Sequence, residues 1–294
     1  MTEKNINSFE QLYKACSAAH AGIYEVALAR EAALSEKSAE ELREIVRHSL
    51  VAMKEAIQSG LKSRELSLSG MCGADCAMLQ EKFAKRPAVF GKTFEKITTY
   101  ALATSEENLR MGKIVACPTA GSCGIVPSVL VALGEDFNKS EDEQINALIT
   151  AGEIGRIISN KVALAGAVAG CQAECGVAAA MSAGAAAQLL GGNLDQILNA
   201  VALAMKNLLG LTCDPVCGLV EIPCVKRNPF LAIHSMTAVE LALAGIKSKI
   251  PLDEVIDALE QTGKLMSPTL KESSQAGLAK TKTAIELEKK LWAK

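Results

Sequence analysis

Aromatic side chains are scarce in this sequence. They make up 3% of the 294 residues although 49% are hydrophobic, and no run alternates convincingly between apolar and polar residues. β-Sandwiches and barrels are rich in aromatic and β-branched residues in such alternation. The abundance of alanine, glycine and leucine instead favours closely packed helices. We therefore expect an all-α fold, a single helical domain over residues 1–294, with the helices of about residues 1–60 as an extension of that domain.

An excess of charge of either sign is also absent. Lysine and arginine total 31 and aspartate and glutamate 33, which gives a net charge of −2 and a pI of about 6.0. The basic residues are scattered and form no stripe, so neither nucleic acid nor an anionic membrane is expected as a partner. No Walker-type phosphate loop and no H-E-x-x-H zinc motif occurs.

A long and purely apolar run is missing as well. The mean hydropathy is +0.20, and residues 162–190 are the strongest candidate for a span across a bilayer of about 30 Å. Gln172, Glu174 and Gln188 interrupt this stretch, which has neither aromatic belts nor basic flanks. We expect it to be a buried helix and the protein to have no membrane partner.

The first residues do not read as a secretory signal, because Glu10 and Lys14 interrupt the first apolar positions. A cytoplasmic location is therefore expected. In that reducing compartment, the ten cysteines are more often metal ligands or core residues than disulfides.

Helix signals recur along the whole chain. Ser8 with Gln11 and Ser38 with Glu41 each fit a capping box. Apolar residues at helical spacing predict a helix over 38–58, which Gly60 is expected to end. A further helix is expected to begin with Pro127 near its first turn. Other helices are expected at 92–111, 141–158, 162–190, 194–209, 229–245 and 252–262, with a surface helix after residue 280.

Five cysteines fall in two groups that carry chemical interest: Cys171 with Cys175, and Cys213 with Cys217 and Cys224. Cysteine thiolates suit zinc or an iron–sulfur cluster. The spacing matches no common zinc-finger or ferredoxin pattern, so plain buried thiols are the alternative. Proline turns beside Cys213 and Cys224 favour the metal interpretation, because structural cysteines usually lie on a regular apolar face.

Two glycine-containing loops precede helices. Residues 118–124, "PTAGSCG", offer backbone amides at a helix start together with the hydroxyls of Thr119 and Ser122, a suitable site for a carboxylate or phosphate. Residues 69–73, "SGMCG", form a weaker loop of the same type. The alternative for both is an ordinary turn that leads into a helix.

These segments resemble one known family, the α subunit of the bacterial iron–sulfur-dependent L-serine dehydratases, also called L-serine ammonia-lyases. The resemblance covers nearly the whole chain. It is carried by "SEENLRMGKIVACPTAGSCGIVPSVL" (105–130), "GCQAECGVAAAMSAGAAAQLLGG" (170–192), "NLLGLTCDPVCGLVEIPCVKRN" (207–228) and residues 241–279. The succession of C-Q-x-E-x-G, L-T-C-D-P and I-P-C-x-x-R-N is the most specific part.

The resemblance implies a [4Fe-4S] cluster held by Cys171, Cys213 and Cys224, with buried Ala/Gly-rich helices around it. Cys175 and Cys217 fall where the family pattern requires no thiol, so they are expected to be packing residues.

The resemblance also implies a site for the substrate carboxylate. Thr119, Gly121 and Ser122 match its positions, with Ser69 and Gly70 nearby.

The resemblance further implies a reaction. Three thiolates leave one iron of the cluster without a protein ligand, and this iron can act as a Lewis acid on the hydroxyl of L-serine. Loss of that hydroxyl and of the α-proton leads to pyruvate and ammonia, a step of amino-acid catabolism and gluconeogenesis. The general base is not identifiable in the sequence. The family's extra α/β domain is absent from this chain, so a β subunit is expected as the partner in a heterodimer.

Two other functions remain open at this point. A pyridoxal-phosphate lyase would use residues 119–124 as its phosphate loop and a lysine such as Lys161 as its Schiff base, although that cofactor usually occupies an α/β scaffold. A non-enzymatic all-α membrane or scaffold protein would contain the cysteines only as core residues.

Overall fold

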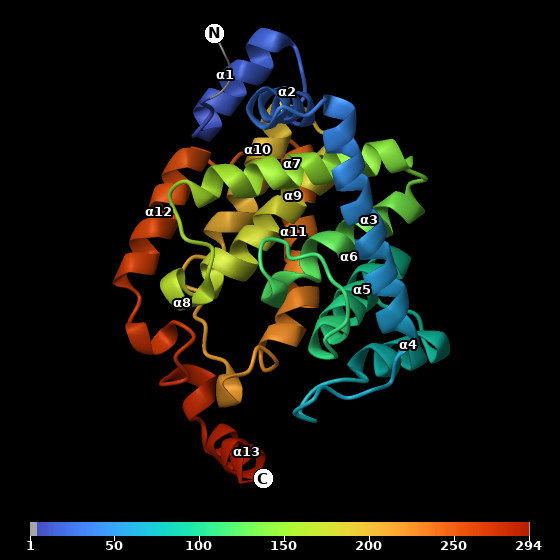
Figure 1. Cartoon of the computed structure of the whole chain (residues 1–294), viewed down its shortest axis with the longest axis vertical. Coiled ribbons are helices and arrows are strands. Elements are labelled where there is room, and N and C mark those ends of the chain that lie inside the picture. The colour runs from blue at the N-terminus through green and yellow to red at the C-terminus, as the bar shows by residue number, and fades with distance from the viewer. Residues whose placement is uncertain (1–4, 294) are drawn as a thin grey trace.

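Thirteen α-helices build the part of the chain that the computed structural model describes, residues 5–293 (Figure 1). Within that range only two isolated β-bridges occur, so the predicted all-α fold is confirmed. The helices are α1 (Phe9–Ala19), α2 (Ile23–Ser35), α3 (Ala39–Lys62), α4 (Asp75–Lys85), α5 (Gly91–Leu109), α6 (Ile125–Asp136), α7 (Glu141–Ser159), α8 (Gly166–Ala169), α9 (Val177–Leu189), α10 (Leu194–Lys206), α11 (Cys224–Leu243), α12 (Leu252–Leu265) and α13 (Lys282–Trp292).

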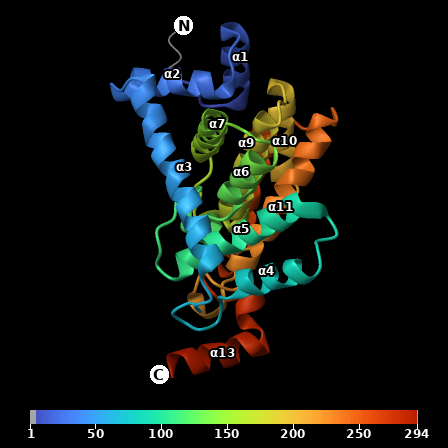
Figure 2. The same cartoon turned by 90° about the vertical axis from the view of Figure 1, so that its right-hand side faces the viewer.

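Helix α9 lies at the centre and packs against α6, α7, α10 and α11 (Figure 2). Every residue of α9 except Gln188 is buried. Its alanines and glycines allow neighbouring helices to approach closely: a Cβ on Gly184 would lie 2.2 Å from Cδ1 of Ile154 on α7. The scarcity of aromatic residues is therefore a property of the core, where small side chains reduce the distance between helix axes.

Helix α3 packs along α5 and α7, and the absence of a side chain at Gly60 allows α3 to approach α5 closely. Ser38 caps α3 as predicted, with its hydroxyl accepting from the amide of Glu41. The prediction that Gly60 ends this helix is wrong, since α3 continues to Lys62. A Cβ on Gly60 would lie 2.1 Å from the carbonyl oxygen of Ala103, so this glycine serves packing rather than termination.

The predicted continuous helix over 162–190 is also wrong. The segment is divided into the short helix α8, a π-helical turn (Gln172–Gly176) and α9. Gly170 separates α8 from the π turn with a φ of 77°, in the left-handed region where a side chain is strained. No helix within residues 5–293 is long and apolar enough to cross a membrane.

Helices α1 and α13, the first and last helices of the described residues, lie at opposite ends of the molecule (Figure 1). Helices α1 and α2 pack against each other, and α13 contacts the short 3₁₀ turns around residues 216–218 and 277–280 at the other end. The thiol-bearing segments lie between these ends, where loops from both halves of the sequence meet.

Candidate active site

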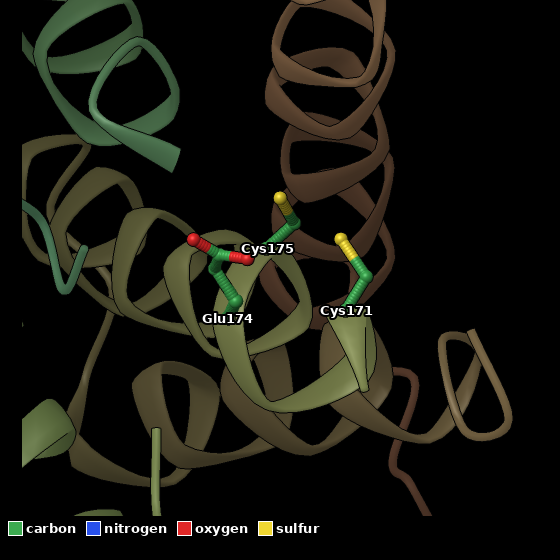
Figure 3. Close-up of side chains that lie close together, drawn as sticks. All are labelled: Cys171, Glu174 and Cys175. Atoms are coloured by element: carbon green, nitrogen blue, oxygen red, sulfur yellow. The ribbon is translucent and has the colours of Figure 1, made fainter. Parts of the chain in front are cut away.

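Cys171, the first thiol of the site, lies between Gly170 and the π turn and caps the start of that turn. A helix with five-residue hydrogen-bonded turns is rare and is frequently found at functional sites. Figure 3 shows the side chains of Cys171, Glu174 and Cys175 rising from this one turn. All three supply potential ligand atoms that lie within 4.8 Å of one another.

Gln172 fixes the π turn against the segment that leads to the next thiol. Its side chain is fully buried. The Gln172 amide donates to the carbonyl of Leu211 at 2.9 Å, and its side-chain oxygen accepts from the amide of Gly210 at 2.8 Å. One backbone hydrogen bond and one hydrogen bond to the Gln172 side chain therefore fix the segment of Cys171 against the segment that leads to Cys213.

Cys213 and Cys224 reach the same region from two other segments. The backbone of Cys213 pairs with the chain near residue 271: its amide donates to Leu270 at 2.9 Å and its carbonyl accepts from Glu272 at 2.7 Å. Cys224 is the first residue of α11, directly after Pro223. We predicted α11 to begin at residue 229, but it begins five residues earlier and includes Pro229.

The three thiols Cys171, Cys213 and Cys224 form one electrostatic unit. Burial, followed by the charges of the other two thiols, raises the pKa of Cys213 above its usual range. Burial and then the charge of Cys171 raise the pKa of Cys224 to about 12. An ionised Cys171 therefore makes ionisation of Cys213 and Cys224 harder, and a cation among the three sulfurs would relieve that repulsion.

Cys171 is the thiol that the chain itself keeps closest to the thiolate state. A hydrogen bond from the Cys175 thiol lowers the pKa of Cys171, with a further contribution from the charge of Arg227, and the same hydrogen bond raises the pKa of Cys175. Arg227 is held in place by the carbonyl of Thr212 at 2.9 Å and the carboxylate of Asp214 at 3.0 Å. Cys175 is thus a donor to Cys171.

The compact group of Cys171, Glu174 and Cys175 differs from the predicted ligand set of Cys171, Cys213 and Cys224. The compact group would suit a single ion. A cluster separates its ligands, because each thiolate binds a different iron atom. The wider set comes from three separate segments and therefore has the kind of arrangement that a cluster requires.

The glycine loop lies directly against the π turn. Thr119 precedes a 3₁₀ turn, Ala120–Ser122, and its hydroxyl donates to the carboxylate of Glu174 and lies 3.1 Å from the Ser122 hydroxyl. A Cβ on Gly121 would lie 2.6 Å from that carboxylate, so a larger residue here would displace the Glu174 side chain. The structure therefore brings the predicted residues Thr119, Gly121 and Ser122 next to the thiol segment.

Asn228, on α11, connects this loop to the helix that carries Cys224. Only 1% of Asn228 is exposed. Its side-chain amide donates to the carbonyls of Gly121 at 2.9 Å and Cys224 at 3.0 Å, and its side-chain oxygen accepts from Gly124 at 2.9 Å. One side chain thus fixes both the loop and the thiol.

The second glycine loop contributes one of its two predicted residues to the site. The Ser69 hydroxyl donates to the buried carboxylate of Glu221 at 2.8 Å, as does the Ser67 hydroxyl at 2.7 Å. Gly70 is exposed, has a φ of 76° and makes the turn itself. Only Ser69 lines the same cavity as Thr119 and Gly121.

That cavity has a volume of about 570 Å³, which is typical of a small-molecule site. Three carboxylates, those of Glu174, Glu221 and Glu272, line it, whereas no lysine or arginine of the described chain does. Burial raises the pKa of Glu174 despite the opposing hydrogen bond from Thr119. The side chains therefore favour the positive end of a bound molecule, and negative groups must be bound by backbone amides or by a metal.

Four residues of the site were missed in the sequence: Glu174, Glu221, Arg227 and Asn228. The polar pair Arg227-Asn228 follows Cys224 after only two residues, and this proximity was the available signal.

Cys217 lies apart from the site, in an apolar group with Val216 and Ala284. Its backbone is left-handed, with a φ of 58°, and its sulfur lies 3.9 Å from that of Met71.

A polar glycine loop lines a cavity of small-molecule size, and buried thiols lie beside that cavity, an arrangement typical of the active site of a helical enzyme. The family profile described as "Serine dehydratase alpha chain" matches residues 18–279. The chain belongs to this family, a family of lyases, and the resemblance stated from the sequence is confirmed.

Three relatives illustrate the range of the family. The "Probable L-serine dehydratase, alpha chain" of Bacillus subtilis is 43% identical over 92% of this chain and 90% of its own. The "L-serine dehydratase, alpha chain" of Peptoniphilus asaccharolyticus is 36% identical over 97% of each chain. The "L-serine dehydratase" of Helicobacter pylori is 39% identical over 94% of this chain but only 62% of its own, so the same region also occurs within a longer polypeptide.

Proposed function

We propose that this chain, together with a β subunit, converts L-serine to pyruvate and ammonia, and that Cys171, Cys213 and Cys224 hold a [4Fe-4S] cluster for this reaction. The observation that carries the proposal is the convergence of these three buried thiols, from three separate segments, beside a cavity that contains the glycine loop. The names of the relatives supply the substrate class.

The donor set fits such a cluster. Soft thiolates are the usual ligands of iron–sulfur clusters. A Cβ on Gly166 would lie 2.9 Å from Sγ of Cys213 and 3.1 Å from the carboxylate of Glu174, so this glycine leaves space in front of the thiol. When bound, the cluster would supply a Lewis acid for the departing hydroxyl, since three thiolates leave one iron without a protein ligand.

The chain's own residues would bind and orient the serine zwitterion. The carboxylate of Glu174 has one oxygen occupied by Thr119, and no described residue donates to the other, which can therefore accept from the α-ammonium. The amides at the start of the 3₁₀ turn lack intrahelical acceptors and suit the α-carboxylate. The hydroxyls of Thr119 and Ser122 contact each other and would fix the Glu174 carboxylate relative to the amides of the 3₁₀ turn.

We assign the general base, and the surface that closes the cavity over the substrate, to the β subunit. No histidine of the described chain lines the cavity, and the carboxylates of Glu174 and Glu221 already accept hydrogen bonds from Thr119 and from Ser67 and Ser69. Glu272, the third carboxylate of the cavity, is exposed and would need the partner to exclude water from it before it could act as a base. The term "alpha chain" in the relatives' names supports a β subunit. The reducing cytoplasm would suit both partners, because exposed iron–sulfur chemistry is sensitive to oxidation.

The pyridoxal-phosphate alternative is disfavoured by Lys161. Its ammonium lies 2.5 Å from the carboxylate of Asp257 on the surface, and this hydrogen bond raises the pKa of Lys161. A Schiff-base lysine needs the opposite shift, because the neutral amine is the nucleophile. Lys161 also does not line the cavity that contains the glycine loop.

The test is a pyruvate-release assay on the full chain, co-expressed with its β subunit and purified without oxygen. We expect serine-dependent pyruvate release and a broad visible absorption that bleaches in air. A Lys161→Met variant is expected to retain both. Oxygen-insensitive activity that requires Lys161 and added pyridoxal phosphate would contradict the proposal.

A further inference from the structure

A second cavity, of about 590 Å³, opens between α2, α3, α7 and residues 115–118. Its walls are largely aliphatic and include Leu42, Val46, Met53 and Ile149. It shares no lining residue with the cavity of the candidate active site. Nevertheless its floor contains Cys117 and Pro118, which directly precede Thr119, so it lies behind the glycine loop.

Arg30 lines this cavity with most of its hydrogen-bonding capacity unused. Only 7% of the residue is exposed. Nη2 donates to the carboxylates of Glu31 and Glu153, each at 3.2 Å. Nε is buried without a partner, and Nη1 has no acceptor among residues 5–293. A guanidinium carries five N–H donors, and burying them unsatisfied is costly.

Glu153 accepts from only one nitrogen of Arg30, because both of its carboxylate oxygens are also bound by Arg156. Nε and Nη2 of Arg156 contact its two carboxylate oxygens at 2.8 and 2.7 Å, a bidentate pair. Three cationic side chains (Arg30, Lys37 and Arg156) and two carboxylates (Glu31 and Glu153) line the cavity, which gives a formal charge of +1. The cavity therefore favours an anion beside Arg30.

Gly152 supplies an independent observation. It lies in the interior of α7 and lines the cavity, and a Cβ at this position would meet no atom within 4 Å. A glycine in a helix interior costs about 1 kcal/mol relative to alanine. Gly152 is exposed and no contact within the described chain requires a glycine there, so a larger side chain at this position would extend into the open space that the residue lines.

We propose that this cavity is a binding site for a small aliphatic monocarboxylate, whose carboxylate pairs with the unused donors of Arg30 and whose hydrocarbon tail packs on the apolar wall. An anionic head group would accept hydrogen bonds from the unsatisfied guanidinium, and the aliphatic side chains that line the cavity would bury the hydrocarbon tail. The site is separate from the proposed active site, and it can be tested whether or not the chain deaminates serine.

The test measures binding of hexanoate to the full chain, co-expressed with its β subunit, by isothermal titration calorimetry. Wild-type protein is expected to bind one hexanoate per chain with saturation. Arg30→Met should weaken binding at least about tenfold, since a hydrogen bond to a charged group is lost. Gly152→Leu should abolish binding by filling the cavity. Gly152→Leu also replaces a helix-interior glycine, so it is expected to fold at least as stably as wild type.

Two controls define the ligand class. 1-Hexanol, which has the tail but no carboxylate, should bind at least about tenfold more weakly than hexanoate. Arg30→Lys keeps the charge but loses the planar donor arrangement, and should fall between wild type and Arg30→Met. No saturable binding by wild type, equal binding of hexanol, or wild-type affinity in Gly152→Leu would each overturn the inference.

Discussion

The hydroxyl of Thr119 donates a hydrogen bond to the carboxylate of Glu174. The two residues are 55 positions apart in the sequence. Thr119 lies in the glycine loop, whereas Glu174 belongs to the π turn that Cys171 directly precedes. The contact therefore joins the part of the site proposed to bind substrate to the part proposed to hold metal, and it orients a carboxylate whose pKa burial has raised.

Replacing Thr119 tests this contact. Thr119→Val keeps the side-chain shape but removes the hydroxyl donor, so the hydrogen bond that holds the Glu174 carboxylate against the glycine loop is lost. We expect the KM for L-serine to rise roughly tenfold, with a smaller effect on kcat, because a hydrogen bond to a charged group is lost. Thr237→Val on α11, whose hydroxyl contacts only the carbonyl of Ile233, is the matched control. An unchanged KM in Thr119→Val would remove the loop from substrate binding.

Asn228 is expected to be essential for stability as well as for the site. Asn228→Ala leaves the amide of Gly124 and the carbonyl of Gly121 buried without a partner, so the free energy of unfolding should fall by about 2 kcal/mol or more. Asn207→Ala removes only a hydrogen bond to Leu203 within one helix and should cost much less. Urea unfolding of both variants measures the difference. Equal losses would show that Asn228 does not hold the loop.

Two glycines in helix interiors should respond oppositely to alanine. Gly60→Ala places a methyl group against the carbonyl of Ala103 and should destabilise the fold by roughly 1–3 kcal/mol, despite the better helix propensity of alanine. Gly152→Ala meets no neighbouring atom and should stabilise it by up to about 1 kcal/mol. Thermal and urea unfolding distinguish these signs. A stabilising Gly60→Ala would contradict the close approach of α3 to α5.

The ion pair between Lys96 and Asp136 should make stability dependent on pH in acid. Burial opposes ionisation of Asp136, but hydrogen bonds from Lys96 and Thr93 outweigh it and lower its pKa below 3.8. A lowered carboxyl pKa adds stability at higher pH, and this stability is lost as pH falls through the folded-state pKa. Lys96→Met should therefore cost about 1 kcal/mol at pH 7 and progressively less below about pH 4. A cost independent of pH would contradict this assignment.

Local signals in the sequence were sufficient for most helices. The cap of α3 at Ser38 and the start of α7 at Glu141 depend on residues within one turn, so the sequence alone predicts them. The interruption of residues 162–190 was not predictable in this way. It depends on Gly170, where a Cβ would meet Met266 and the carbonyl of Leu211, and these contacts are remote in the chain.

The candidate site was predictable where single residue types carry the chemistry. Thiols and glycine-rich loops stand out in a sequence, and the structure brings those segments together. Glu174 and Asn228 gave no comparable signal, because their importance comes from partners at Thr119, Gly121 and Gly124. The role of Gly60 was misinterpreted for the same reason, since its constraint lies on another helix.

The central claim is that Cys171, Cys213 and Cys224, and not Cys175 or Cys217, hold the cluster. It is tested most directly by iron and sulfide analysis of the five single alanine variants, each co-expressed with the β subunit and kept free of oxygen. Wild type is expected to contain about four irons and four sulfides per chain. Cys217→Ala should match wild type, and Cys175→Ala should retain much of the cluster. The other three should lose both iron and activity. A full iron content in Cys171→Ala, together with its loss in Cys175→Ala, would contradict the account.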